Sequence, residues 1–585
     1  MINFLTSFSP AFILIAAGIV AAFTPLYQGR KFLMIAAPAL VLVLINIMYL
    51  NGDADGALGG YFQVAGIELT TIRIDNISII WGNIFAFAGI LNGIFGLHEK
   101  CKITDTSALI YTGAGLGAVF AGDLITLFMF WELLALSSVF IVWRGGKESY
   151  PAGMRYLAMH ILSGVLLLAG AVIYGKATGS YEFNNIGIDA PGGKLMLLAF
   201  GIKAGFPFLH NWIQDSYPKS SVTGTVILSV FTTKLAIYAL LRGFAGTEIL
   251  IYIGGVMTVF PVFFAVLEND LRKVLSYSLN NQLGFMVAGI GIGSSLALNG
   301  VAAHVVVDIL FKGLLFMSMG AVLHRVGTAK ASELGGLFRT MPLTTLFCLI
   351  GAGSISAFPM MGGFISKSMI IAAMFEGHHY IVFGMLLFAS AGVLEHSGIK
   401  VPYFAFFSHD SGKRPKEAPW NMLVAMGIAS FLCIYLAWPW GGEFVGFKGL
   451  YAMLPHDTTT GAAEFHPYTA DHVVFQMQLL MGAMFAFTFL KRFGWYPPER
   501  RAQILDFDWT YRRLGLNLLK WIDAMWTRLG ALIIYMLKTM FGRIGTRLYH
   551  VFSPAGALSQ AAPSGIAAVF TAAMLAALLL GAYLF

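Results

Sequence analysis

Five ionisable side chains occur inside apolar segments of this sequence, where charged residues are otherwise rare. They are Glu132, Lys203, Lys234, His304 and Lys367. A lysine at the centre of a membrane helix costs about 2.5–3.5 kcal/mol on insertion scales, so a segment that keeps one uses it for an ion path, a counter-charge or a proton relay. Histidine exchanges its proton near neutral pH and suits the same task. The residue types therefore predict a buried row of groups that pass protons, with Lys234 linking Lys203 to His304.

Three further residues are candidates for an accessory part of this row. They are Asp308, Lys312 and Lys400. His304, Asp308 and Lys312 are spaced four apart on one helical face, and acid before base is the favourable order for an ion pair. A single buried histidine is a hydrogen-bonded core residue as often as it is part of a proton path. Three ionisable groups on one helical face favour a proton path that contains water. We interpret Lys400 as a side chain that extends its charge to the membrane surface. The alternative is a group through which protons leave the path.

Glu132 lies in the middle of its segment, and Lys203 is its expected partner. An isolated carboxylate at that depth would take up a proton, whereas a neighbouring ammonium keeps it charged. At about 4 Å two unit charges interact by about 4 kcal/mol at an effective dielectric constant of about 20. Opening and closing such a pair would decide whether the lysine keeps its proton. A static structural ion pair is the alternative.

Two apolar segments are interrupted next to a lysine. The first is broken at 204–208, which contains Gly205 and Pro207 and follows Lys203; the second is broken at 357–363, just before Lys367. Proline removes a backbone donor and clashes with the preceding turn. Interrupted backbone at membrane depth survives only where protein or a wet cavity supplies hydrogen bonds, and such breaks mark transport sites.

Sixteen apolar segments of this sequence approach the roughly 20 residues that a bilayer requires. The two broken helices each stand fourth in a run of five, at 107–242 and 248–407. Because five is odd, the runs begin on opposite sides of the membrane, and the repeat must be inverted. We therefore expect an all-α integral membrane protein, in which 1–106 supplies N-terminal helices and 408–585 supplies C-terminal helices.

The composition supports this fold class and excludes several functions. The chain is 58% hydrophobic and only 11% charged, against about 25% charged in soluble proteins. Its net charge of +8 comes from bases in short loops on one side of the predicted membrane, which indicates topology rather than nucleic-acid binding and places the N-terminus outside. The cysteines Cys101, Cys348 and Cys433 stand alone, without disulfide or iron–sulfur spacing. No metal and no cofactor are expected.

The C-terminal region contains a further helix of a different kind. Between 509 and 552 apolar residues recur at three- and four-residue intervals, with arginines and lysines between them. This pattern predicts an amphipathic helix along the cytoplasmic interface. Roughly 40 residues would reach about 60 Å. The alternative is one more tilted span through 529–537.

Six motifs between about 107 and 407 resemble the antiporter-like subunits shared by respiratory complex I, Mrp-type Na⁺/H⁺ antiporters and membrane-bound hydrogenases. They are FWELLALSS, GIKAGFPFLHNWIQDSYP, TTKLAIYALLR, DLRKVLSYSLNNQLGFM, HVVVDILFKGLLFMSMG and GGFISKS. The resemblance implies a core of about 14 helices and a proton path through the five residues named first. The lysines in the eighth and twelfth helices look most like the D-type component of Mrp antiporters. The sequence has Asp308 where the relative with a long lateral helix usually has a histidine, and it extends beyond the fourteenth helix, near which D-type components commonly stop.

These observations predict a proton-translocating subunit of a multisubunit cation/proton antiporter in the bacterial inner membrane. Its expected partners are other membrane subunits, protons, Na⁺ in the case of Na⁺/H⁺ exchange, and the lipid bilayer, with no nucleic acid. The same machinery in a complex I-like NADH:quinone oxidoreductase, a membrane-bound hydrogenase or an inorganic-carbon uptake complex is the alternative. An anchor subunit that binds haem or quinone is a second alternative, and the scattered histidines give it little support.

Overall fold

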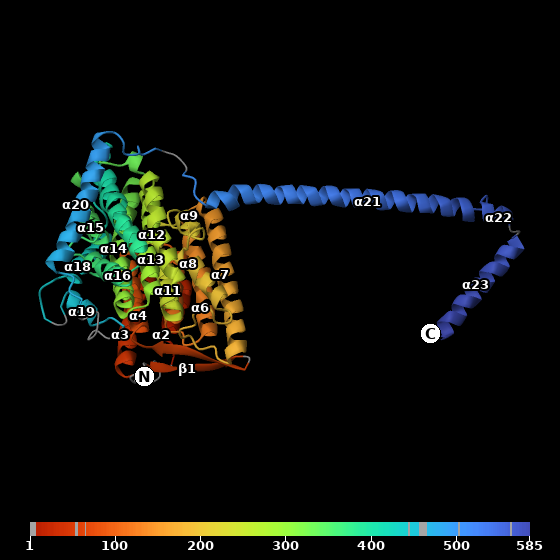
Figure 1. Ribbon diagram of the computed structural model, residues 1–585, viewed down its shortest axis with the longest axis horizontal. Coiled ribbons are helices and arrows are strands. Elements are labelled where there is room, and N and C mark those ends of the chain that lie inside the picture. Colours follow the sequence, from red (N-terminus) through yellow and green to blue (C-terminus); the bar gives the residue numbers. More distant parts are fainter. Residues whose placement is uncertain are drawn as a thin grey trace. The chain divides into compact units, whose positions relative to one another are not determined.

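The computed structural model describes residues 8–52, 57–64, 66–442, 445–455, 465–500, 504–561 and 564–584. The chain forms two compact units, Met1–Asp506 and Phe507–Phe585. Both units are built from helices, and the first is a bundle whose long helices run side by side (Figure 1).

The first unit contains most of the helices. Its first third consists of α2 (Pro10–Phe23), α3 (Tyr27–Leu50), α4 (Ser78–Phe95), η1 (Gly96–His98), α5 (Lys102–Val119), α6 (Leu124–Trp143) and α7 (Ser149–Thr178). Its middle consists of α8 (Gly193–Ala204), α9 (Asn211–Ser216), α10 (Val222–Leu228), α11 (Phe231–Phe244), α12 (Ile249–Leu267), α13 (Leu271–Ile292) and α14 (Ser295–Val326). Its last part consists of η2 (Ala331–Glu333), η3 (Leu337–Arg339), α15 (Pro342–Ile355), α16 (Gly362–Glu376), α17 (Tyr380–Val393), η4 (Leu394–Lys400), η5 (Tyr403–Phe407), α18 (Trp420–Tyr435), α19 (Phe447–Tyr451) and α20 (Ala470–Arg492).

Ten of the described helices are long and apolar enough to cross a membrane, and three shorter apolar helices, α2, α15 and α18, accompany them. The predicted multi-pass helical architecture is thus confirmed. The division into two inverted five-helix repeats, and the count of sixteen spans, stay predictions.

Both predicted helix breaks are present. Helix α8 ends at Ala204, where Gly205 adopts a φ of +75°, and α9 begins at Asn211. Helix α15 ends at Ile355 and α16 begins at Gly362, with the non-glycine residues Ala357 and Met360 at φ values of +60° and +68° between them. L-residues rarely adopt this left-handed region, so the surrounding packing must hold the second break in place.

Two irregularities were not predicted. The apolar stretch 220–242 is not one helix but consists of α10 and α11, separated at Ser229 and Val230. The apolar stretch 381–407 changes from α-helix to the π-helical turns η4 and η5. Such π-helical turns are rare and are frequent at functional sites. The first irregularity has no proline or glycine at Ser229 and Val230, whereas the second contains Gly398 and Pro402.

A β-hairpin between α3 and α4 was also not predicted. Strands β1 (Ala57–Val64) and β2 (Ile67–Ile74) pair antiparallel, with Val64 opposite Ile67. The amide of Arg73 donates to the carbonyl of Phe120, and the amide of Gly122 donates to that of Thr70. The hairpin is therefore fastened to the α5–α6 turn, at one end of the bundle (Figure 1).

The opposite end of the bundle is here called the basic face. It is defined by residues at helix ends and in the connecting loops, which are Lys100, Lys102, Arg144, Lys147, Lys219, Lys273, Arg325, Lys330, Lys413, Arg414, Lys416, Lys491 and Arg492. Between the two ends, the most apolar parts of the segments 222–244 and 295–326 are buried inside the bundle, whereas α20 is mostly exposed on its outside. Helices α11 and α14 carry four of the eight ionisable residues of interest, which are Lys234, His304, Asp308 and Lys312.

The second unit contains η7 (Thr510–Gly515), α21 (Leu516–Phe552), α22 (Ala557–Ala561) and α23 (Ser564–Leu584). The predicted amphipathic segment is one continuous helix from Leu516 onward, and it has no buried residue within its unit. Its 37 residues correspond to about 55 Å. Its placement along the membrane surface, rather than across it, stays a prediction.

Candidate functional site

The centre of the site is an ion pair between α11 and α14. Lys234 Nζ lies 2.6 Å from Asp308 Oδ2, and both side chains have no exposed area. Lys234 also donates to the carbonyl of Ser229, at the break between α10 and α11. The break thus exposes a carbonyl that helps to hold the ammonium, and Asp308 balances its charge. Removing one partner of such a buried pair leaves an uncompensated charge, which typically costs about 3–5 kcal/mol.

Lys312 has a different partner from the one expected. The sequence suggested an ion pair with Asp308 one turn away, but Lys312 Nζ donates to Ser278 Oγ of α13 at 2.7 Å. Asp308 instead pairs with Lys234, which α11 brings within reach. Spacing within one helix could not reveal this choice.

Lys203 and Glu132 are not paired in this conformation. Lys203 Nζ donates to the carbonyl of Trp131 at 2.6 Å and lies 4.2 Å from the centroid of the Trp131 ring. The carboxylate of Glu132 lies over Gly164 of α7, where a Cβ would come within 1.6 Å of Oε1. Among the described residues, Oε1 has no hydrogen-bond partner. The static pair that the sequence left open is therefore absent here, whereas a pair that opens and closes is compatible with this arrangement.

Lys367 is held at the second break. Its Nζ donates to the carbonyl of Ile355, the last residue of α15, at 2.7 Å, and it lies 5.0 Å from the centroid of the Phe285 ring. The preceding residue, Ser366, shares a 2.8 Å hydrogen bond with Nδ1 of His304. The structure thus brings His304 of α14 next to the element that carries Lys367.

A polar branch that sequence analysis missed leads away from Lys312. Ser278 Oγ accepts a 2.7 Å hydrogen bond from Ser397 Oγ of η4, and Ser397 Oγ is 2.8 Å from His396 Nδ1. All of these side chains are buried. The branch joins α14, α13 and η4, and its signal in the sequence is weak because single serines are common in membrane helices.

Lys400 does not extend to the membrane surface as first interpreted. Its side chain has no exposed area, and Nζ lies 2.9 Å from Oε1 of Glu499. It also donates to the carbonyls of Val266 and Glu268, both at 2.7 Å. The C-terminal end of α12 and a carboxylate from a distant part of the chain therefore enclose this ammonium.

A charged cluster stabilises the hairpin end of the bundle. Asp75, just before α4, accepts two hydrogen bonds from Arg242 Nη2 at 2.8 and 2.9 Å. Burial acts to raise the pKa of Asp75, but Arg242, the amide of Ser78 and Arg73 together lower it to about 2. The cluster ties α11 to the loop after the hairpin and thereby helps to position Lys234.

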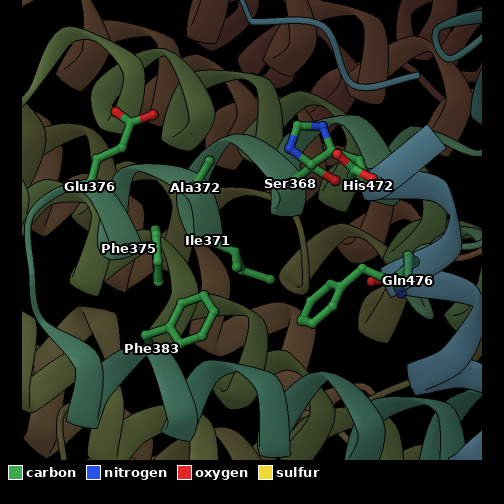
Figure 2. A pocket seen from close by; sticks show the side chains of 10 residues that line it. Ser368, Ile371, Ala372, Phe375, Glu376, Phe383, His472 and Gln476 are labelled. Atoms are coloured by element: carbon green, nitrogen blue, oxygen red, sulfur yellow. The ribbon is translucent and has the colours of Figure 1, made fainter. Parts of the chain in front are cut away.

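A pocket of about 400 Å³ opens beside the second break (Figure 2). Its residues come from α16, α17 and α20, and they are Ser368, Ile371, Ala372, Phe375, Glu376, Phe383, Asp471, His472, Phe475 and Gln476. Figure 2 shows Ser368, His472 and Gln476 on one side and the aromatic rings of Phe375 and Phe383 on the other. Gln476 Nε2 donates to the carbonyl of Ser356 at 3.3 Å. The pocket thus reaches from the hairpin end of the bundle toward Lys367.

No three His, Cys, Asp or Glu side chains are grouped as metal ligands in the described part of the chain. The arrangement instead offers amines, carboxylates, imidazoles and hydroxyls in a row through the bundle. Such groups can hold or pass protons, and they need no resident cofactor to do so.

This fold and site define a multi-pass membrane protein whose interior is lined with ionisable residues at broken helices. Residues 121–393 match the family described as NADH:quinone oxidoreductase/Mrp antiporter, TM. This chain is similar to members of that family over these residues.

Three known proteins illustrate the likeness. The D-type component of the Na⁺/H⁺ antiporter of Bacillus subtilis strain 168 is 25% identical over 433 residues, which are 69% of this chain and 86% of that protein. A chain of the Mrp complex from Dietzia sp. DQ12-45-1b has the same fold, with a TM-score of 0.69 at 20% identity over 81% of this chain and 99% of its own. A chain of the membrane-bound sulfane sulfur reductase, an archaeal respiratory membrane complex, has a TM-score of 0.69 at 22% identity over 98% of this chain and 99% of its own.

Proposed function

We propose that this chain is the proton-translocating subunit of a multisubunit cation/proton antiporter, with Na⁺ as the expected counter-ion. The observation that carries the proposal is the buried Lys234–Asp308 pair, which joins α11 to α14. A fully buried ion pair adds little net stability compared with apolar packing. The same bundle buries two further lysines, Lys203 and Lys367, each near a helix break. The pair therefore favours a role in charge movement.

The path would begin at Glu132 and Lys203, cross Lys234 and Asp308, and reach His304 and Lys367. Glu132 would control the charge of Lys203 by approaching and withdrawing. The pocket beside Lys367 supplies a route from the hairpin end of the bundle, which the predicted topology places outside the cell. The basic face would then be cytoplasmic, and the membrane would be the bacterial inner membrane.

The expected partners are other membrane subunits. The B. subtilis relative is itself named as one subunit of an antiporter, and the match covers most of its length. The proton-pumping subunit of a redox complex is the second candidate, because the fold of the sulfane sulfur reductase chain matches this chain over the C-terminal helices as well.

Reconstitution tests the proposal directly. The intact complex is placed in vesicles, a Na⁺ gradient is imposed, and the internal pH is followed with a dye. Lys234→Ala should abolish Na⁺-driven proton flux without lowering the amount of assembled complex, while the surface variant Lys330→Ala should keep it. Loss of the complex itself in Lys234→Ala would favour a structural role.

Identification of the co-purified subunits by mass spectrometry separates the two candidates. Antiporter subunits alone favour Na⁺/H⁺ exchange, and subunits with redox centres favour the second candidate. In the latter case Na⁺ gradients should drive no flux in the wild-type complex.

A further inference from the structure

The short segment that follows α20 inserts two side chains into the basic face of the bundle. It reads Tyr496, Pro497, Pro498, Glu499. Each proline fixes its own φ near about −65° and also restricts the residue before it to extended conformations. Tyr496 and Glu499 are therefore separated by a stiff extended spacer, so their positions depend on each other.

Tyr496 fixes one end of this segment. Its side chain is buried, and its hydroxyl donates to Glu395 Oε1 at 2.6 Å. Its ring packs edge-to-face on Phe487 at 5.1 Å and is stacked near Phe404. The hydroxyl thus binds one oxygen of a carboxylate on η4, while the ring is anchored by apolar contacts on α20 and η5.

Glu499 fixes the other end. Only 7% of its side chain is exposed, although it lies on an irregular segment, and its ion pair with Lys400 is 2.9 Å long. A buried carboxylate is costly unless it is paired. Because Lys400 already donates to carbonyls at the end of α12, Glu499 supplies the charge that balances this ammonium.

Glu395 and Lys400 belong to the same π-helical turn as His396 and Ser397. The latter two are the last members of the hydrogen-bonded branch that starts at Lys312. The segment Tyr496–Glu499 therefore covers the point where this branch approaches the basic face.

We propose that Tyr496–Glu499 is a latch that closes the basic-face end of the branch from Lys312 to η4. In the closed state Glu499 holds Lys400 against the end of α12, and Tyr496 holds Glu395. Withdrawal of the segment would free both groups to exchange protons with the solution. Glu499 is a positioning residue that acts through Lys400. The latch rests on the proposed proton transport, since a barrier at this point has a purpose only if protons move along the branch.

The test compares three complexes: wild type, Glu499→Gln and the control Asp410→Asn. Glutamine keeps the shape of Glu499 and removes its charge. Asp410 pairs with Arg414 on the same face, but this pair is exposed, so its loss should matter little. Two quantities are measured on the intact complex: hydrogen–deuterium exchange of residues 394–407, and the passive proton leak of vesicles without a cation gradient.

In Glu499→Gln we expect the backbone amides of residues 394–407 to exchange hydrogen for deuterium at least about tenfold faster than in the wild type. The reason is that losing one partner of a buried ion pair favours local opening. The proton leak should rise severalfold, and Asp410→Asn should change neither quantity. Unchanged exchange and leak in Glu499→Gln would overturn the latch. A fall in Na⁺-driven flux without faster exchange would also overturn it, since Glu499 would then be a member of the path.

A second variant covers the case in which Glu499→Gln does not assemble. Tyr496→Phe keeps the ring contacts and removes only the hydroxyl bound to Glu395, and it should change exchange and leak in the same direction. No change in Tyr496→Phe would then reject the latch. If the wild-type complex shows no Na⁺-driven flux, the proposed function fails, whereas exchange of residues 394–407 still decides whether the latch exists.

Discussion

Replacement of Lys203 by arginine separates a lysine that only neutralises charge from one that releases its proton. Both side chains are cationic, but arginine is effectively never deprotonated in a protein. The reference pKa of an arginine side chain lies roughly 2–3 units above that of a lysine, so a guanidinium releases its proton about 10²–10³-fold less often. If Lys203 is a relay, the proton flux of Lys203→Arg should fall by the same factor.

The surroundings of Lys203 determine how well an arginine side chain fits at this position. Lys203 Nζ already lies against the carbonyl and the ring of Trp131, and a guanidinium can make both contacts. The side chain is fully buried, so the larger group should cost about 1–3 kcal/mol of packing energy. The complex should therefore assemble in reduced but measurable amount.

The assay is Na⁺-driven proton flux in vesicles, normalised to the amount of complex, for wild type, Lys203→Arg and Glu132→Gln. We expect almost no flux with arginine. Glu132→Gln should also be defective, because it removes the charge that controls the lysine. Near-wild-type flux for Lys203→Arg would refute the relay and leave charge neutralisation as the role of Lys203.

Three further predictions concern the surrounding structure. Asp308→Asn keeps the shape of the side chain but leaves Lys234 without its anion, so proton flux should fall at least about tenfold; flux equal to wild type per assembled complex would contradict a role for the pair. Asp75→Asn should lower the free energy of unfolding by about 2 kcal/mol at neutral pH, since the folded pKa of about 2 lies below the unfolded value of 3.8. This stabilisation is present above the unfolded pKa and is lost as the pH falls through the folded one, so the difference in melting temperature between variant and wild type should vanish toward about pH 2; a constant difference would argue against Asp75 ionisation. Truncation after Asp508 removes η7, α21, α22 and α23. It should leave the first unit folded but weaken assembly with partner subunits, as native gels of the membrane complex can show, because a long interfacial helix can brace neighbouring subunits. Normal assembly of the truncated chain would reject this bracing role.

The sequence by itself determined the membrane architecture and the residues of greatest interest. Long apolar runs leave a chain few alternatives to membrane helices, because backbone polar groups must be satisfied inside the bilayer. Glycine and proline next to Lys203 and Lys367 located two breaks, since these residues change backbone geometry through local sterics alone. The ionisable residues were visible as exceptions to an apolar background, whereas their roles in transport stay predictions.

Only the tertiary structure decided how these residues pair. Helical spacing predicts an ion pair between Asp308 and Lys312. In the folded bundle, Asp308 pairs with Lys234 of α11, and Lys312 donates to Ser278. The Lys400–Glu499 pair joins segments that are far apart in the chain, and no local pattern indicates such a contact. Periodicity specifies which side chains share a face of one helix, whereas the choice of partner depends on which faces of different helices meet, and that is fixed by the packing of the whole bundle.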